Sequence, residues 1–173
     1  SDIGTSLGTL ISHADASNTN SWILYYTESI DRVIFDVRTN TSGQNIEAAM
    51  SANTAPGNRT HFLVVMFRRI NTTSVGLEIW LNGVQGANVT SSRNVSLLTK
   101  MDTLIGDSSN TNFVGFNGTI DEVLWFNRTL SAQEILYLNN SNGVWETIVA
   151  QETGTAGENW SACVTPNDGT VDG

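Results

Sequence analysis

Basic residues are scarce in this sequence of 173 residues, which holds eight Lys and Arg residues against 17 Asp and Glu residues. Charged residues make up 14% of the chain and the formal net charge is −9, whereas typical soluble domains carry about 25% charged residues. The basic pair Arg68-Arg69 directly follows a predicted strand, where a solvated strand end explains it. Because proteins bind nucleic acids through clustered basic side chains, the sequence excludes a nucleic-acid partner.

Long apolar runs are also missing. The longest run, FLVVMF at 62–67, has the length of a strand and falls far short of the ~18 residues that a membrane-spanning helix needs. The chain starts at Ser1 with neither an initiator Met nor a signal-peptide pattern. We therefore expect a processed chain or a fragment of a longer protein, with enough residues for one domain with its own core.

The sequence lacks the usual motifs of catalysis. It contains no glycine-rich phosphate loop, no HExxH and no Cys/His cluster. Glycosidases need two carboxylates about 5 Å apart in one cleft, and the closest spacing, Glu28 with Asp31, falls at a predicted turn. His13 and His61 have no partner nucleophile, and core packing explains His61 better. The sequence therefore predicts a protein that is not an enzyme.

Cysteine is limited to Cys163. An unpaired cysteine is a liability in an oxidising compartment, so its partner lies beyond this chain or the thiol is buried.

Triplets of the form Asn-x-Ser/Thr are abundant. The 19 Asn residues and 38 Ser and Thr residues would give about four such acceptors for N-linked glycans by chance. Nine are present: Asn40, Asn58, Asn71, Asn88, Asn94, Asn117, Asn127, Asn139 and Asn159. A chain rich in Ser, Thr and Asn can make any single site by accident, but the whole set favours a glycosylated protein outside the cell.

Apolar and β-branched residues alternate in short runs with turn signals between them, which predicts an all-β protein with one short helix. The run 61–69 is apolar on both faces and predicts a buried strand, and Asn82-Gly83 predicts a tight hairpin. Residues 40–59 contain many turn formers and predict a looser excursion. The predicted strands cover residues 21–27, 31–39, 61–69, 75–90, 101–107 and 119–127.

The helix is predicted after the last strand. Ser131 and Glu134 have the spacing of a capping box. Ile135, Leu136 and Leu138 give the helix an apolar face, and the Asn-rich stretch 139–143 predicts its end.

Several of these segments are recognisable together. HFLVVMF, LEIWLNGV, TLIGD and above all FNGTIDEVLWFNRTLSAQEI, residues 116–135, resemble the laminin G-like domain of the concanavalin A-like superfamily. The resemblance covers about residues 8 to 140, with GTLIS at 8–12 as the family's G-x-I-x-S strand. It implies a two-sheet antiparallel jelly-roll sandwich with one short helix near the C-terminal end.

The chain departs from this family at both ends. Such domains usually begin some forty residues earlier, with strands that are missing here, so part of a sheet is cut away or supplied from elsewhere. The tail resembles the closing strands of immunoglobulin-like repeats of microbial surface proteins, in which WSACVT at 160–165 reads as a short strand. We therefore predict two parts, a laminin G-like jelly roll at 1–143 and an Ig-like tail fragment at 144–173.

Asp121 is the one candidate for a metal ligand. It lies with Glu122 in the predicted strand 119–127, where the faces are otherwise apolar, so an ionised carboxylate needs hydrogen-bond donors or a cation. One reading is that Asp121 accepts backbone N–H groups from a neighbouring turn. The second, implied by the resemblance, is that it binds a structural Ca²⁺. Catalysis is the weakest, because adjacent residues of a strand point to opposite faces.

The resemblance and the glycan acceptors together predict a non-catalytic surface or adhesion module of a larger extracellular glycoprotein. Two alternatives stay open. A structural subunit could build a filament or surface layer with copies of itself by strand exchange, since an open sheet edge recruits strands. A carbohydrate-binding module could stack sugars on Trp80 or Tyr25 if a sheet face exposes them, whereas Trp22 and Trp125 are expected in the core or on the concave face. The identity of the glycan or protein ligand stays open.

Overall fold

The computed structural model describes residues 7–14, 21–39, 44–57, 59–93, 95, 102–109 and 113–141. All of them belong to the first of the two units into which the chain divides, residues 1–143. The second unit, residues 144–173, lies outside the described residues, and so do Cys163 and the predicted Ig-like tail. Within the described part of the chain, no helix is long and apolar enough to cross a membrane.

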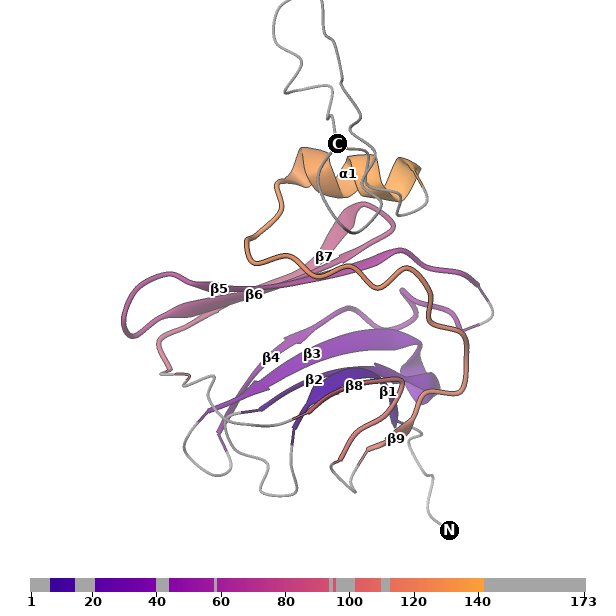
Figure 1. Ribbon diagram of the computed structural model, residues 1–173, viewed down its shortest axis with the longest axis horizontal. Helices are drawn as coiled ribbons and strands as arrows, with labels where there is room; N and C mark the ends of the chain where they lie inside the picture. The colour runs from indigo at the N-terminus through magenta and orange to yellow at the C-terminus, as the bar shows by residue number, and fades with distance from the viewer. Residues whose placement is uncertain are drawn as a thin grey trace, which may run out of the picture. The chain divides into compact units, whose positions relative to one another are not determined.

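The described strands form two stacked sheets (Figure 1). The larger sheet has the order β4-β3-β2-β1-β8, with β9 beside β1, and the smaller sheet has the order β5-β6-β7. All pairs are antiparallel except the short parallel contact of β9 with β1, which confirms the predicted two-sheet antiparallel sandwich. The strands are β1 (Leu7–His13), β2 (Trp22–Thr27), β3 (Arg32–Arg38), β4 (Asn45–Ala49), β5 (Leu63–Arg69), β6 (Val75–Leu81), β7 (Val84–Ser91), β8 (Thr103–Ile105) and β9 (Val114–Gly115).

The main core fills the space between the two sheets. It consists of every second residue of β2, β3 and β4 packed against every second residue of β6, as the alternation of a strand dictates. Leu77 and Ile79 at the centre of β6 are fully buried, as is Val37 opposite them. A smaller apolar cluster covers the other face of the larger sheet, where Tyr25 meets Phe113 edge to face.

The local predictions hold for the β6–β7 hairpin and for β1. Asn82 and Gly83 have φ angles of 51° and 78°, as the two central residues of a type I′ turn require, and the predicted strand 8–12 lies within β1. The looser excursion predicted for 40–59 contains a strand, β4, that sequence reasoning missed.

Two predictions about strands are wrong. Residues 119–127 form no strand: they run as irregular backbone, and Glu122 adopts a left-handed φ of 50°. The run in β5 is not a buried central strand, because β5 ends the smaller sheet and Leu63, Val65 and Phe67 are only half-buried. Both differences have the same physical cause. Among the described strands, β5 is paired on one side only, and residues 119–127 are paired with none.

The helix α1 (Ala132–Asn140) covers the outer face of the smaller sheet (Figure 1). It begins with the predicted capping box, in which the Ser131 Oγ accepts the Glu134 N–H and the Ser131 N–H donates to Glu134 Oε2 at 2.7 Å. Ile135 and Leu138 are buried, whereas Leu136 stays largely exposed. The helix ends within the predicted Asn-rich stretch.

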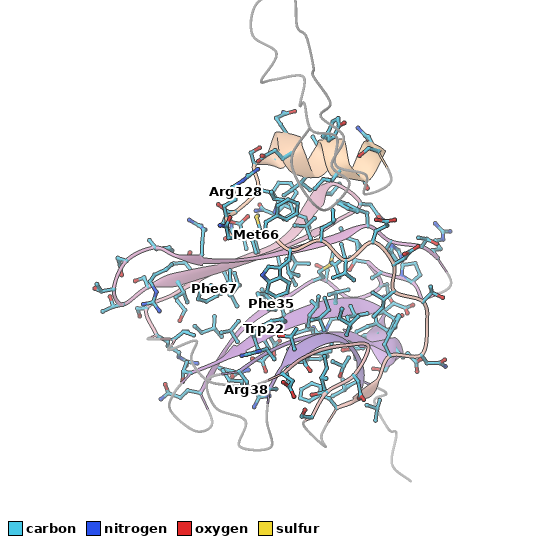
Figure 2. All side chains as sticks on the ribbon, viewed as in Figure 1. Trp22, Phe35, Arg38, Met66, Phe67 and Arg128 are labelled. Carbon is cyan, nitrogen blue, oxygen red and sulfur yellow. The ribbon has the colours of Figure 1, made fainter. Side chains whose placement is uncertain are left out.

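Glu134 is also held by Arg128, whose Nη2 lies 2.6 Å from Glu134 Oε1 (Figure 2). That ion pair, followed by the Ser131 N–H, lowers the pKa of Glu134 from 4.5 to about 2. A carboxylate whose pKa is lower in the folded chain stabilises the fold fully above pH 4.5, and this contribution is lost as the pH falls towards 2.

We therefore expect Glu134→Gln to lower the melting temperature by roughly 2–4 °C at pH 7, as a loss of about 1 kcal/mol does in a domain of this size. The difference from the wild type should shrink between pH 4.5 and pH 2, measured by circular dichroism melts across that range. The control Gln133→Ala changes an uncharged neighbour in the same helical turn. A gap for Glu134→Gln that stays constant with pH would contradict the assigned ion pair.

Candidate functional site

An aromatic cluster lies where Trp125 of the segment 116–130 contacts Trp22 of β2, and we call His13, Trp22, Phe35 and Trp125 the aromatic group. Phe35 and Trp22 lie between the two sheets (Figure 2). His13 stands opposite Trp22 in the register of β1 with β2, which brings the two rings together. The strands thus fix three members of the group, and the irregular segment 116–130 brings the fourth.

The rings form a continuous series. The rings of His13 and Trp22 stack with centroids 5.9 Å apart, and Trp22 meets the edge of Phe35 at 6.2 Å. The ring of Trp125 tilts over Trp22 at 5.7 Å. His13 also contacts the Thr103 hydroxyl through Nδ1 at 3.1 Å. Aromatic pairs in such geometries stabilise each other beyond the area they bury, so Trp22 gives Trp125 a fixed support.

Trp125 is 70% exposed although it rests on this support, and its neighbours Val123 and Leu124 are exposed as well. An exposed apolar patch of this kind usually marks an interaction surface. An indole fixed from below and open above offers a flat ring for an apolar ring face and an N–H for a polar group. The arrangement is suited to binding a ligand with an apolar ring face.

The other aromatic candidates are less available. Tyr25 is buried, and burial, followed by the nearby carboxylates Glu47 and Asp36, raises its pKa to about 12. Trp80 is half-buried, and its Nε1 donates to Glu78 Oε2 at 3.3 Å. The sequence pattern placed Trp125 in the core or on a concave face, whereas the structure leaves it mostly exposed because the segment that carries it forms no strand.

Asp121 is exposed, and the predicted apolar surroundings are absent because the segment 119–127 is not a strand. Its Oδ1 accepts the N–H of Glu122 at 2.9 Å, which is a local backbone bond. Ca²⁺ takes six to eight oxygen ligands, and the described residues contain no group of three His, Cys, Asp or Glu side chains that could hold a metal ion. A calcium ion at Asp121 would therefore depend on backbone carbonyls or on residues outside the described ones, and the calcium hypothesis stays a prediction.

Two carboxylates on neighbouring strands escaped the sequence reasoning. Asp36 of β3 stands opposite Glu47 of β4, and an alignment of the strands was needed to find them. Asp36 is 2% exposed and its Oδ2 lies 2.9 Å from Arg38 Nε. A carboxylate buried in an ion pair cannot reach a substrate, so Asp36 and Glu47 do not form the pair of accessible carboxylates that glycoside cleavage requires.

The remaining candidates have local structural roles. Glu28 begins a 3₁₀ turn (Glu28–Ile30), and Asp31 follows it with a φ of 46° and accepts the hydroxyl of Tyr26. His61 is half-buried and contacts the Pro56 carbonyl through Nε2 at 3.0 Å. His61 thus ties a loop to the sheet, which corrects its predicted place in the core.

The predicted glycan acceptors within the described residues lie mainly on the surface. Asn71, Asn88, Asn117 and Asn127 are exposed, whereas Asn139 is half-buried in α1. The acceptors outside the described residues are Asn40, Asn58, Asn94 and Asn159.

A comparison with known protein families matches residues 3–136 to the laminin G-like family described as the concanavalin A-like lectin/glucanases superfamily. No curated protein matches the chain. The family match ends before the tail, so the resemblance of 144–173 to an Ig-like unit stays a prediction. The match spans most of the chain and agrees with the two-sheet sandwich, and the chain therefore belongs to the concanavalin A-like lectin/glucanase superfamily.

Proposed function

We propose that this chain is a non-catalytic adhesion module at a cell surface and that it binds a glycan through the aromatic group. The observation that carries the proposal is Trp125, which is 70% exposed and held 5.7 Å from Trp22. Membership of a lectin superfamily supports a glycan as the ligand. Fold alone does not define function, so the proposal rests on this site.

The non-catalytic part of the proposal is supported by the carboxylates. Asp36 is buried in its ion pair with Arg38, and Glu47 beside it is exposed. A glycosidase needs an acid and a second carboxylate that both reach the scissile bond. The aromatic group contains no carboxylate, which suits recognition without cleavage.

The extracellular location is supported by the exposed glycan acceptors. Four exposed acceptors lie on different elements of the sandwich: Asn71 in the β5–β6 turn, Asn88 on β7, and Asn117 and Asn127 in the segment 116–130. N-linked glycans are bulky and require surface positions, which these residues occupy.

Trp125→Ala should weaken glycan binding at least about tenfold, because it removes the ring that a sugar would stack on and about 1.4 kcal/mol is a factor of ten in affinity. Binding is measured by titrating the wild type and variant against the polysaccharides that score on a glycan array. Trp125→Phe should retain part of the affinity. Val84→Ala is the matched control, because Val84 is 68% exposed on β7, away from the aromatic group. No binding by the wild type, or equal binding by Trp125→Ala, would refute the proposed site.

Glycopeptide mass spectrometry of the protein from its natural source should find glycans at Asn71, Asn88, Asn117 and Asn127. Occupancy at Asn139 should be lower, because its side chain lies in α1 and is half-buried. Bare asparagine at all of these positions would remove the support for an extracellular location.

Asp121→Asn tests the calcium hypothesis. The variant keeps the Oδ1 acceptor for the Glu122 N–H, so the melting temperature should change by less than about 1 °C, and equally in Ca²⁺ and in EDTA. A loss confined to the Ca²⁺ buffer would confirm Asp121 as a calcium ligand, with partners outside the described residues.

A further inference from the structure

The open edge of β5 differs from the other edges of the described sheets. The larger sheet ends in two short strands, five residues in β4 and three in β8. At the other edge of the smaller sheet, four of the eight residues of β7 are polar, one of them the glycan acceptor Asn88, and the register with β6 is irregular. Short strands, bulges and polar or glycosylated side chains are features that hinder pairing with another chain.

None of these features protects β5. It has seven residues in unbroken register with β6. Its first five side chains, from Leu63 to Phe67, are apolar on both faces, and its two charges come at the end, in Arg68 and Arg69. Strands that are apolar on both faces belong inside a sheet, whereas a long, flat, apolar edge recruits another strand. The sequence of β5 is thus that of a central strand, whereas the described residues supply a neighbour on one side only.

The segment 119–127 also has a strand-like sequence without a paired neighbour among the described strands. It runs in front of the smaller sheet in the same direction as β5, from right to left in Figure 1. It is fixed at Trp125 by Trp22, and shortly after its end the Leu130 N–H contacts Met66 Sδ of β5 at 3.3 Å. Its strand-like sequence forms no ladder, and Val123 and Leu124 are exposed. Alternate strands of an antiparallel sheet share one direction, so a single strand antiparallel to both would complete the sheet.

We propose that a second copy of this chain supplies that strand from its residues 160–165, between β5 and the segment 119–127. This inference goes beyond the proposed glycan binding and does not rest on it. Residues 160–165 lie outside the described residues and belong to the second unit of the chain. Their sequence, WSACVT, alternates Trp160, Ala162 and Val164 with Ser161, Cys163 and Thr165. Such a strand places one apolar face on a core and a more polar face outwards.

The charges of residues 144–173 also favour a strand donated from this segment and antiparallel to β5. Residues 144–173 contain five Asp and Glu and no Lys or Arg. In an antiparallel pair, the start of the donated strand lies beside the end of β5, which brings Glu158 close to Arg68 and Arg69. Arg68 Nε lies 3.3 Å from Glu78, and Arg69 Nη2 donates to a carbonyl at 2.6 Å. Each guanidinium has five N–H donors, so both retain donors for a further carboxylate.

Disulfide trapping on the full-length chain tests the proposal, because Cys163 is its single cysteine. With Trp160, Ala162 and Val164 facing the core, Cys163 faces outwards, like Val64 on β5. Val64→Cys should give, under mild oxidation, a disulfide between position 64 of one copy and Cys163 of another, since facing residues of neighbouring strands satisfy disulfide geometry. The readout is a non-reducing gel with peptide mapping over a dilution series.

The controls separate strand pairing from random oxidation. Gln85→Cys introduces the thiol on β7, which is also an edge but is half polar and irregular, and should give at least tenfold less of the mapped disulfide. Val64→Cys combined with Cys163→Ser should give none. A disulfide within one copy, equal products from both edges, or no product from Val64→Cys would each overturn the proposal.

A second measurement avoids substitutions in β5. The wild-type chain should sediment as oligomers whose size grows with concentration, and deletion of residues 158–173 should reduce it to a monomer. A wild-type chain that stays monomeric at all concentrations, or a deletion variant that still assembles, would contradict the donation of a strand by a second copy.

Discussion

The apolar contact between β6 and the larger sheet is the constraint on which the rest of this structure depends. Leu77 and Ile79 are fully buried, and they meet the inward faces of β2, β3 and β4. Each such side chain contributes roughly 1.5–3 kcal/mol when it leaves water. Because β6 lies at the centre of the smaller sheet, its burial fixes the positions of β5 and β7 through backbone pairing.

Away from this central contact, packing between paired strands gives way to contacts made by single side chains. On the side of β5, the segment 116–130 packs on the sandwich through single side chains rather than through a ladder. Phe116 packs against the main core, Trp125 rests on Trp22, and Leu130 is buried beside Met66. The residues between these anchors are largely exposed. The same incomplete layer therefore leaves Trp125 open to a ligand and β5 open to a strand.

Much of the fold could be predicted from the sequence, because the relevant signals are local. Asn82-Gly83 specifies its turn through two left-handed residues, and Ser131 with Glu134 specifies the helix start. Strands that form only through pairing with a neighbour were less predictable. The sequence NIEAA of β4 has weak strand propensity, and its pairing with β3 creates the strand. The opposite holds at 119–127, where propensity favours a strand and no described neighbour pairs with it.

The candidate site was harder to predict for the same reason. The sequence directed attention to Asp121, because a carboxylate in an apolar strand needs a partner. Once the strand is absent, Asp121 is an exposed side chain with a local backbone bond. Trp125 moves the other way, from an expected buried or concave position to an exposed ring. The position of its ring depends on Trp22, which is distant in the sequence, and its exposure depends on the lack of a described strand paired with 119–127. Neither feature can be predicted from residues 119–127 alone.

The two proposed activities make opposite demands on Trp125. Glycan binding needs its ring exposed, as it is in the described structure, where no described strand pairs with the outer side of β5. A strand in that position would convert 119–127 into a paired strand, whose alternation would turn Val123 and Trp125 to one face. The contact with Trp22 already places that face towards the core, so pairing would bury the indole further. It follows that a copy that has accepted a strand would lose its glycan platform, and that adhesion would belong to copies whose β5 edge is still open.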